Sequence, residues 1–317
     1  MVAVYSLEDI KRALSDVEMT PHIEQGFVAY SNNEAVVPPV GELLFDDPPG
    51  DTHIKYGYIK GGDIYVVKIA SGFYKNPEIG LSSSSGLMLV FSQKTGALQA
   101  VLLDEGYLTN VRTAIAGRIA AKYLAPKNIQ AIGVIGTGIQ ARMQVEYLKE
   151  DTTCRDLFVW GRSDGKVAAY VRDMEKAGFK VTSVDSPALV AKNCNVIITT
   201  TPSTIPLLFA DDILPGTHIT AMGSDTDTKQ ELDANILGRA DIVVGDSLSQ
   251  CRERGEISKA LAAGLLEEKN VHELGRFIAD KSSRKIRDNS CISVADLTGV
   301  AVQDIQIAAA VCQQLAK

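Results

Sequence analysis

A glycine-rich turn between an apolar strand and a helix constrains the fold of this 317-residue chain more than any other feature. The turn, Gly136-Thr137-Gly138-Ile139-Gln140-Ala141, follows the apolar run AIGVI and opens the helical segment IQARMQVEYLKE. The first glycine permits a tight bend, the second lets backbone N–H groups approach a pyrophosphate, and the small last residue lets the helix pack closely on the strand. The helix N-terminus adds partial positive charge. We therefore expect Gly136, Gly138, Ile139 and Gln140 to bind a dinucleotide.

Short apolar segments alternate with helical ones throughout this part of the chain. The expected strands are QAIGVIG, LFVWG, FKVTSV, NVIITTT, THITAMG and ADIVVGD. Strands that are apolar on both faces and alternate with helices are typical of a parallel sheet built from β-α-β units. The sequence predicts an α/β fold, with a Rossmann-type doubly wound parallel sheet over residues 128–289.

The first part of the chain has a different pattern. Ser6 and the acid three positions later predict a capped helix over residues 6–14, and a second helix is expected over 21–30. The proline- and acid-rich residues 38–50 are interpreted as a loop, and β-rich runs then follow up to a helix over 109–124. We expect residues 1–127 to form a second α+β domain for substrate binding and dimerisation. The C-terminal residues 290–317 would complete it, with a last helix packed on its sheet.

Composition excludes several classes of function. There are 32 Lys and Arg against 39 Asp and Glu, a net charge of −7, which disfavours nucleic acid and anionic membranes as partners. No leader pattern or membrane-length apolar run is visible, so a cytoplasmic protein is expected. The five cysteines show no Cys-x-x-Cys spacing, and no metal site is predicted.

The end of the strand after the glycine turn bears on cofactor choice. NAD sites commonly place an acid there for the ribose hydroxyl, whereas NADP sites place cations and hydroxyls there for the extra phosphate. This strand ends in Trp160-Gly161-Arg162-Ser163. Arg162 and Ser163 favour NADP(H) over NAD(H), and Asp164 just beyond keeps NAD(H) as an alternative.

Several segments together resemble the ornithine cyclodeaminase and μ-crystallin family over essentially the whole chain. They are VVKIASGFYKNPEIGL, LTNVRTAIAGRIAAKYLA, IGVIGTGIQAR, GSDTDTKQELD and GDSLSQCRERGE. The resemblance implies a homodimeric NAD(P)-dependent enzyme acting on a small amino or imino acid. Ketimine reduction or amino-acid dehydrogenation is the leading hypothesis. Amino-acid cyclodeamination and non-catalytic, NADPH-dependent ligand binding of the μ-crystallin kind are the alternatives.

Specific residues match the family's substrate site. A substrate carboxylate needs a cation, and Arg112 can supply a bidentate one. Lys68 matches the family's second substrate cation, although strand alternation alone slightly favours a solvent-facing lysine there. Asp225 matches the aspartate proposed to exchange the proton of the substrate nitrogen, with Asp227 as a rival.

The resemblance also assigns cofactor contacts and shows one departure. Thr113, Thr200 and Met222 are expected beside the cofactor. Members that act on ornithine carry glutamate at the position of Lys55, thirteen residues before Lys68, where an acid can hold the amino groups of the substrate. A lysine there would repel a diamine, which favours a neutral imino acid or one with a second acidic group.

One further cluster is given a structural interpretation. Arg252, Glu253, Arg254 and Glu256 are expected to form a charged helix face, solvated or at a subunit contact.

Overall fold

The computed structural model describes residues 2–73, 75–280 and 290–317, and the chain divides into two compact units. The first unit comprises Met1–Arg112 and Val300–Lys317, and the second comprises Thr113–Gly299. The bounds expected from sequence assigned residues 113–127 and 290–299 to the first unit instead. The difference arises because strand β15 (Ser293–Asp296) lies inside the parallel sheet of the second unit, between β12 and β13.

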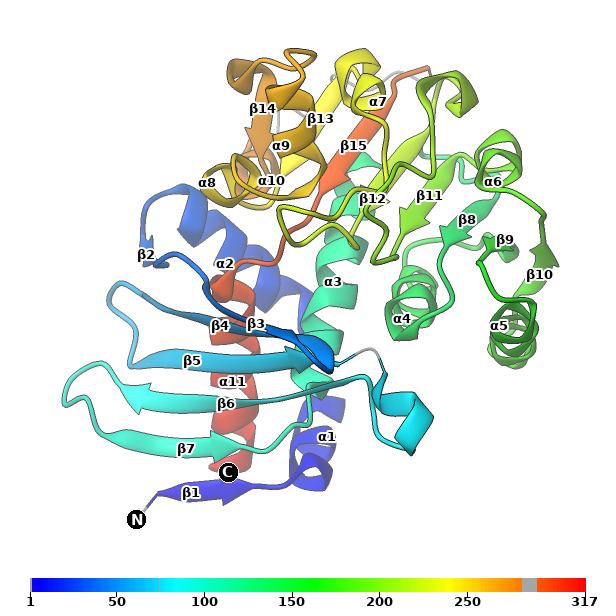
Figure 1. The fold of residues 1–317 in the computed structure, drawn as a ribbon. Coiled ribbons are helices and arrows are strands. Elements are labelled where there is room, and N and C mark those ends of the chain that lie inside the picture. The colour runs from blue at the N-terminus through cyan, green and yellow to red at the C-terminus, as the bar shows by residue number, and fades with distance from the viewer. Residues whose placement is uncertain (1, 74, 281–289) are drawn as a thin grey trace. The chain divides into compact units, whose positions relative to one another are not determined.

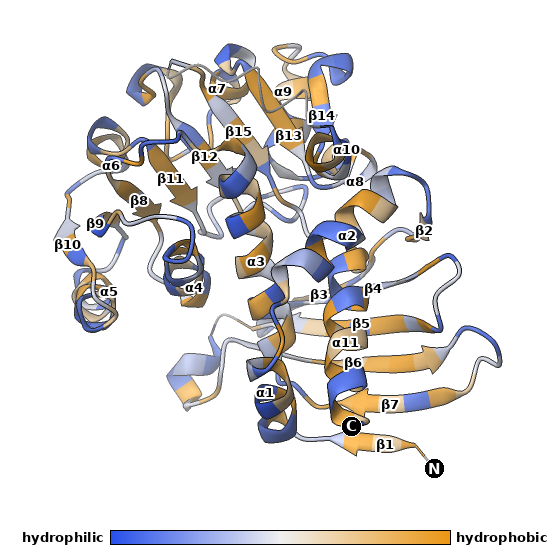
Figure 2. Ribbon diagram, turned by 180° about the vertical axis from the view of Figure 1, so that it is seen from behind, coloured by the Kyte–Doolittle hydropathy of each residue, from blue (hydrophilic) through white to orange (hydrophobic). Residues whose placement is uncertain are grey.

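The first unit is built on one mixed sheet with the strand order β1-β7-β6-β5-β4-β2, and β3 also pairs with β4 (Figure 1). Its strands are β1 (Ala3–Tyr5), β2 (Ala35–Val36), β3 (Gly41–Asp46), β4 (Pro49–Ile59), β5 (Ile64–Gly72), β6 (Ser84–Ser92) and β7 (Leu98–Leu102). Buried and half-buried residues alternate along β5, β6 and β7, as expected for strands with one covered face. Figure 2 shows these strands as largely hydrophobic.

Helices cover one face of this sheet. They are α1 (Leu7–Ser15), α2 (Thr20–Ser31) and α11 (Ala301–Leu315), and α11 contacts β4, β5, α1 and α2 (Figure 1). The capping box predicted at Ser6 is present, since its hydroxyl accepts from Asp9 N–H and the Asp9 carboxylate accepts from Ser6 N–H. The expected packing of the last helix on the N-terminal sheet is confirmed.

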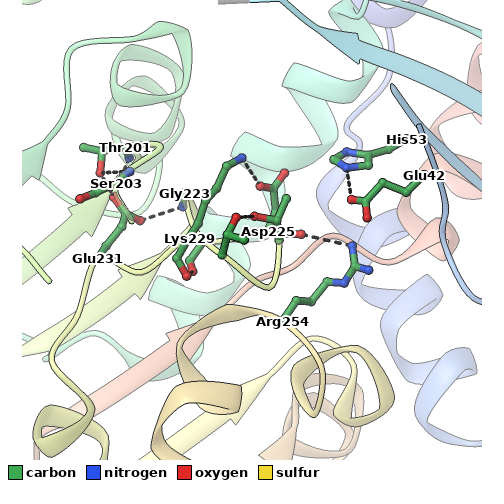
Figure 3. A network of polar contacts seen from close by, with 12 residues as sticks. Glu42, His53, Thr201, Ser203, Gly223, Asp225, Lys229, Glu231 and Arg254 are labelled. Carbon is green, nitrogen blue, oxygen red and sulfur yellow. Dashed lines mark hydrogen bonds and ion pairs between the residues drawn. The ribbon is translucent and has the colours of Figure 1, made fainter. Parts of the chain in front are cut away.

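The prediction of a loop over residues 38–50 is wrong. This segment contains β3, which pairs antiparallel with β4 from Gly41 opposite Ile54 to Asp46 opposite Pro49. Pro38 and Pro39 lie before β3, Pro48 lies in the turn after it, and Pro49 is the first residue of β4, so none of them removes a hydrogen bond from the middle of the ladder. A bond of 2.7 Å between His53 Nε2 and Glu42 Oε1 joins the two strands (Figure 3).

The second unit contains the predicted parallel sheet, with the strand order β10-β9-β8-β11-β12-β15-β13-β14. The strands are β8 (Ile132–Ile135), β9 (Asp156–Trp160), β10 (Lys180–Ser183), β11 (Val196–Thr199), β12 (His218–Ala221), β13 (Ile242–Gly245), β14 (Val271–Glu273) and β15. The connecting helices are α4 (Ile139–Leu148), α5 (Asp164–Lys176), α6 (Pro187–Asn193), α7 (Ala234–Arg239), α8 (Leu248–Cys251), α9 (Gly255–Ala262) and α10 (Leu274–Ala279). Helix α3 (Tyr107–Leu124) begins in the first unit and ends in the second.

The core of the second unit explains why its strands are continuous apolar runs. Every residue of β8, β11, β12, β13 and β15 is buried. Strands covered on both faces lose the alternating pattern, and their carboxyl ends then form the edge where such sheets bind ligands. Within the described residues, no helix combines the length and apolarity that crossing a bilayer requires.

Candidate active site

The glycine turn connects β8 to α4 as predicted. Gly136 has φ of +122°, and a Cβ there would lie 2.5 Å from Thr200 Oγ1, so both backbone conformation and space require glycine. Gly138 is the N-cap of α4, is exposed, and has open space where a Cβ would stand. Ile139 is exposed, Gln140 is half-buried, and no described side chain caps this helix. The turn therefore offers backbone N–H groups to an anion, which fits a dinucleotide pyrophosphate.

The tip of β9 lies beside the glycine turn. Gly136 N–H donates to Trp160 O at 2.9 Å, and a Cβ on Gly161 would lie 2.7 Å from Thr137 Cγ2. Arg162 and Ser163 follow directly and are exposed, with Asp164 in the first turn of α5. The guanidinium and the hydroxyl therefore stand at the end of β9, where the adenosine end of a dinucleotide binds in this fold.

Thr113 and Gln140 are linked through one buried side chain. Gln144 Nε2 donates to Thr113 O at 3.0 Å and to Gln140 Oε1 at 3.2 Å. Thr113 thus lies beside the helix that follows the glycine turn.

The ends of β11 and β12 bring Thr200 and Met222 to the same edge of the sheet. Thr200 N–H donates to Ile135 O at 2.9 Å, and Met222 N–H donates to Thr199 O at 3.0 Å. Thr200, Met222 and Gly136 are therefore gathered where β8, β11 and β12 end.

Asp225 follows three residues after Met222, on a loop rich in polar contacts (Figure 3). Its Oδ1 forms an ion pair of 2.6 Å with Lys229 Nζ, and its carbonyl accepts from Arg254 Nη1 at 3.3 Å. The Asp225 side chain is 37% exposed. Asp227 is exposed, and its carbonyl accepts from Lys259 Nζ. The loop thus holds Asp225 partly buried, with a cation beside it.

The first unit gathers the predicted substrate cations. Lys68 of β5 lies directly opposite Lys55 of β4, and both are buried. Asp304 of α11 forms ion pairs of 3.1 Å with Lys68 Nζ and 3.1 Å with Arg112 Nε. Gln303 Oε1 accepts a further bond from Arg112 Nη1 at 3.0 Å. The solvent-facing interpretation of Lys68 is therefore wrong, because α11 covers this face of the sheet.

Burial and neighbouring cations weaken the hold of Lys68 on its proton. Its side chain is 2% exposed, and desolvation, followed by the positive charge of Arg112, lowers the pKa of the ammonium to about 7. Asp304 opposes this shift, and Lys55 adds to it. The cluster therefore favours an incoming anion, which would stabilise the charged form of Lys68.

Two buried acids at these places were not predicted. Asp304 is the one charged residue of α11, in which apolar residues and four glutamines make up the rest, and Glu231 is fully buried near the end of β12. A charged residue inside an apolar helical stripe is the signal that could have identified Asp304. The interpretation of Arg252 to Glu256 as a charged outer face is wrong for Glu256, which is 1% exposed and accepts bonds from Glu231 N–H and Leu232 N–H.

A parallel sheet with this glycine turn at its carboxyl edge defines an α/β protein with a Rossmann-like NAD-binding domain. A family model described as the ornithine cyclodeaminase/mu-crystallin family matches residues 2–317. The chain belongs to this family.

Relatives of known sequence cover nearly the whole chain. An uncharacterized cyclodeaminase, y4tK of Sinorhizobium fredii, is 39% identical over 92% of this chain and 89% of its own. The alanine dehydrogenase of Archaeoglobus fulgidus is 35% identical over 96% and 92%. Their names span both reaction types considered for this family.

Solved structures show the same two-unit architecture. An archaeal alanine dehydrogenase dimer with bound NAD matches with a TM-score of 0.89 and 31% identity, over 99% of this chain and 96% of that one. The Thermococcus litoralis Δ1-pyrroline-2-carboxylate reductase, in complex with NADH and L-proline, matches with a TM-score of 0.91 and 25% identity, over 99% and 98%.

Proposed function

We propose that this protein is an NAD(P)H-dependent oxidoreductase that reduces a small α-imino acid to the L-amino acid, or catalyses the reverse dehydrogenation. The observation that carries the proposal is the buried group of Lys68, Arg112 and Asp304, together with the glycine turn of the second unit. The first suits a carboxylate, and the second suits a dinucleotide. The relatives, an alanine dehydrogenase and a pyrroline-2-carboxylate reductase among them, support an enzyme of this kind.

Arg112 and Lys68 bind the substrate carboxylate. The Asp304 carboxylate forms an ion pair with each cation, 3.1 Å from Lys68 Nζ and 3.1 Å from Arg112 Nε. These contacts hold the ammonium and the guanidinium in one orientation. Charge-assisted hydrogen bonds of this kind contribute about 1.5–3 kcal/mol each. A single negative neighbour shared by two cations leaves positive charge for the substrate to neutralise.

Asp225 exchanges the proton on the substrate nitrogen. When bound, the nicotinamide supplies a hydride to the α-carbon of the C=N bond, so that one proton on nitrogen completes the amine. The Lys229 ammonium at 2.6 Å stabilises Asp225 as the anion before substrate arrives. An ammonium or a protonated imine then offers Asp225 a second positive partner. In the dehydrogenation direction the carboxylate takes the proton from the ammonium nitrogen, and in the reduction direction the protonated carboxyl returns it to the imine nitrogen.

The second unit holds the cofactor at four places. Gly136, Gly138, Ile139 and Gln140 bind the pyrophosphate, Thr113 contributes beside α4, and Thr200 and Met222 lie at the nicotinamide end. Arg162 and Ser163 receive the 2′-phosphate of NADP(H). The two solved relatives hold NAD and NADH, which makes NAD(H) the competing cofactor.

Lys55 argues against the cyclodeaminase alternative, which the name of the Sinorhizobium relative favours. A diamino acid held by Lys68 and Arg112 would bring its second ammonium close to Lys55, which is buried opposite Lys68 on the adjacent strand. Like charges in a partly buried site repel by a few kcal/mol. We therefore assign the protein a substrate without a cationic side chain.

Homodimerisation through the uncovered sheet face is part of the proposal. On the face away from α11, the residues are apolar and half-buried: Tyr65, Val67, Ile69, Leu87, Leu89, Phe91 and Val101. Tyr65 and Phe91 stack with ring centroids 4.8 Å apart. An apolar face of this extent is typical of a protein interface, and the archaeal relative is described as a dimer. Helix α11 was expected to share in the contact, but most of it is buried within the chain.

A spectrophotometric panel tests the proposed function. Purified protein is assayed with NADPH and NADH against cyclic and linear α-imino acids, and with NADP⁺ and NAD⁺ against alanine, proline and ornithine. A reductase consumes reduced cofactor in proportion to substrate. Ammonia release from ornithine, with no net change in reduced cofactor, would instead establish cyclodeamination.

A further inference from the structure

Glu231 is a fully buried acid that the reaction above does not use. It lies after the Asp225 loop and is 0% exposed. Burial raises the pKa of its carboxyl to about 7, and the donors around it oppose that shift. A buried carboxylate is costly unless hydrogen bonds compensate it, so the groups that it binds show what it does.

Four donors converge on this carboxylate, from two separate segments. Figure 3 labels Glu231 and two of the donor residues, Thr201 and Gly223. Oε1 accepts from Thr201 N–H at 2.6 Å and from Thr201 Oγ1–H at 2.8 Å. Oε2 accepts from Thr199 Oγ1–H at 2.8 Å and from Gly223 N–H at 2.8 Å. Both oxygens thus have two donors each, which an ionised carboxylate satisfies and a neutral amide cannot.

The two segments are those that carry the proposed reaction. Thr199 and Thr201 flank Thr200 at the end of β11, and Gly223 lies two residues before Asp225. Gly223 is packed so closely that a Cβ there would lie 2.1 Å from Thr201 O and 2.6 Å from Glu231 Oε2. The carboxylate therefore clamps the end of β11 to the turn after β12.

We propose that Glu231 is a positioning residue, whose carboxylate holds the Thr200 segment and the Asp225 turn in one fixed arrangement. This inference rests on the proposed function for the role of Asp225, but the clamp itself is a property of the free protein. Glu256 is its matched control, because it is equally buried in the same unit and its carboxylate accepts from the backbone N–H groups of Glu231 and Leu232 rather than from the Thr200 segment or the Asp225 turn.

The first arm of the test uses amide hydrogen exchange in the free full-length protein at pH 8, without cofactor. Glu231→Gln removes one of the two acceptor oxygens, and we expect the amides of Thr201 and Gly223 to exchange at least tenfold faster. Glu256→Gln should accelerate exchange at residues 231 and 232 and leave Thr201 and Gly223 unchanged. The clamp is overturned if the amides of Thr201 and Gly223 exchange at the wild-type rate in Glu231→Gln. It is also overturned if Glu231→Gln and Glu256→Gln accelerate their exchange equally.

The second arm uses turnover of the best substrate in the panel. Glu231→Gln should lower kcat at least tenfold with KM changed less than threefold, whereas Glu256→Gln should keep kcat within threefold. Equal losses in both variants overturn the positioning role. If the wild-type protein reduces no imino acid and oxidises no amino acid, the proposed function fails, and the exchange arm still decides whether the clamp exists.

A milder pair of variants guards against misfolding of Glu231→Gln. Thr201→Val removes one hydroxyl donor and keeps the β-branched shape, and we expect exchange of the Thr201 amide to rise about threefold. Thr201→Ser keeps the hydroxyl and should restore the wild-type rate. An identical effect of valine and serine contradicts the proposal.

Discussion

Lys55 and Lys68 stand directly opposite each other on adjacent antiparallel strands, and both are buried on the sheet face that α11 covers. Two buried lysines on paired positions repel each other, and the shift of the Lys68 pKa to about 7 includes this repulsion. The pair makes this end of the first unit suited to anions.

Replacing Lys55 by an acid should change substrate choice. In Lys55→Glu a repulsion of a few kcal/mol toward a second ammonium becomes an attraction, so kcat/KM for ornithine should rise at least tenfold relative to alanine. Initial rates with both amino acids measure the ratio. Lys60→Glu, an exposed position just after the same strand, is the control and should leave the ratio unchanged. A ratio unaffected by Lys55→Glu would show that position 55 does not face the substrate side chain.

Substrate affinity should depend on pH through Lys68. Because its pKa lies at about 7, the ammonium is present below that pH and is lost as the pH rises through it. KM for an imino or amino acid should therefore increase above pH 7, by up to about tenfold per pH unit, whereas KM for the cofactor should not. Lys68→Arg keeps its charge throughout and should flatten the profile. A wild-type KM that is constant from pH 6 to 9 would contradict this role of Lys68.

Arg162 should control the choice between the two nicotinamide cofactors. It follows β9 and is exposed, so its substitution should leave stability nearly unchanged. Arg162→Asp removes the partner of a 2′-phosphate and adds an acceptor for a ribose hydroxyl, and kcat/KM for NADPH relative to NADH should fall about 10- to 100-fold. Arg172→Asp, on the exterior of α5, serves as the control. If the wild-type protein already prefers NADH, the preference inferred from Arg162 is wrong.

The sequence was informative where one residue pattern has one structural cause. The glycine turn, the apolar parallel strands and the capping box at Ser6 follow from local geometry, and all three are present. Strand alternation could not show which face of β5 is covered, because that depends on α11, more than two hundred residues later. The burial of Lys68 was therefore indicated only by resemblance.

The contacts missed from sequence are those between distant segments. The Asp304 side chain contacts Lys68 and Arg112. The Glu231 side chain contacts Thr199, Thr201 and Gly223. Aspartate and glutamate are usually exposed, so residue type alone predicts that both side chains lie at the surface. The loop predicted over residues 38–50 was wrong for a related reason. The proline content of this segment indicated a loop, but β3 is stabilised by its hydrogen bonds to the neighbouring strand β4.

The uncovered sheet face should determine the oligomeric state. Leu89 lies near the middle of that face, on β6 between β5 and β7. Leu89→Glu would bury an unpaired charge in a dimer but would face solvent in a monomer, so the variant should shift from dimer to monomer in light scattering at micromolar concentration. Gln25→Glu, exposed on α2 among the helices that cover the opposite face of the sheet, is the control. A wild-type protein that is monomeric at the same concentration would contradict the proposed interface.

Catalysis by Asp225 can be separated from cofactor binding because the chain has a single tryptophan, Trp160, whose carbonyl accepts from Gly136 N–H beside the glycine turn. Quenching of its fluorescence by added NADH or NADPH therefore reports binding at that turn. Asp225→Asn removes the proton-exchanging group, and turnover should fall about 10²- to 10⁴-fold while the quenching titration stays within threefold of wild type. Asp227→Asn, exposed on the same loop, should retain turnover. Full turnover by Asp225→Asn would contradict the proton-exchanging role of Asp225, and a loss confined to Asp227→Asn would transfer that role to Asp227.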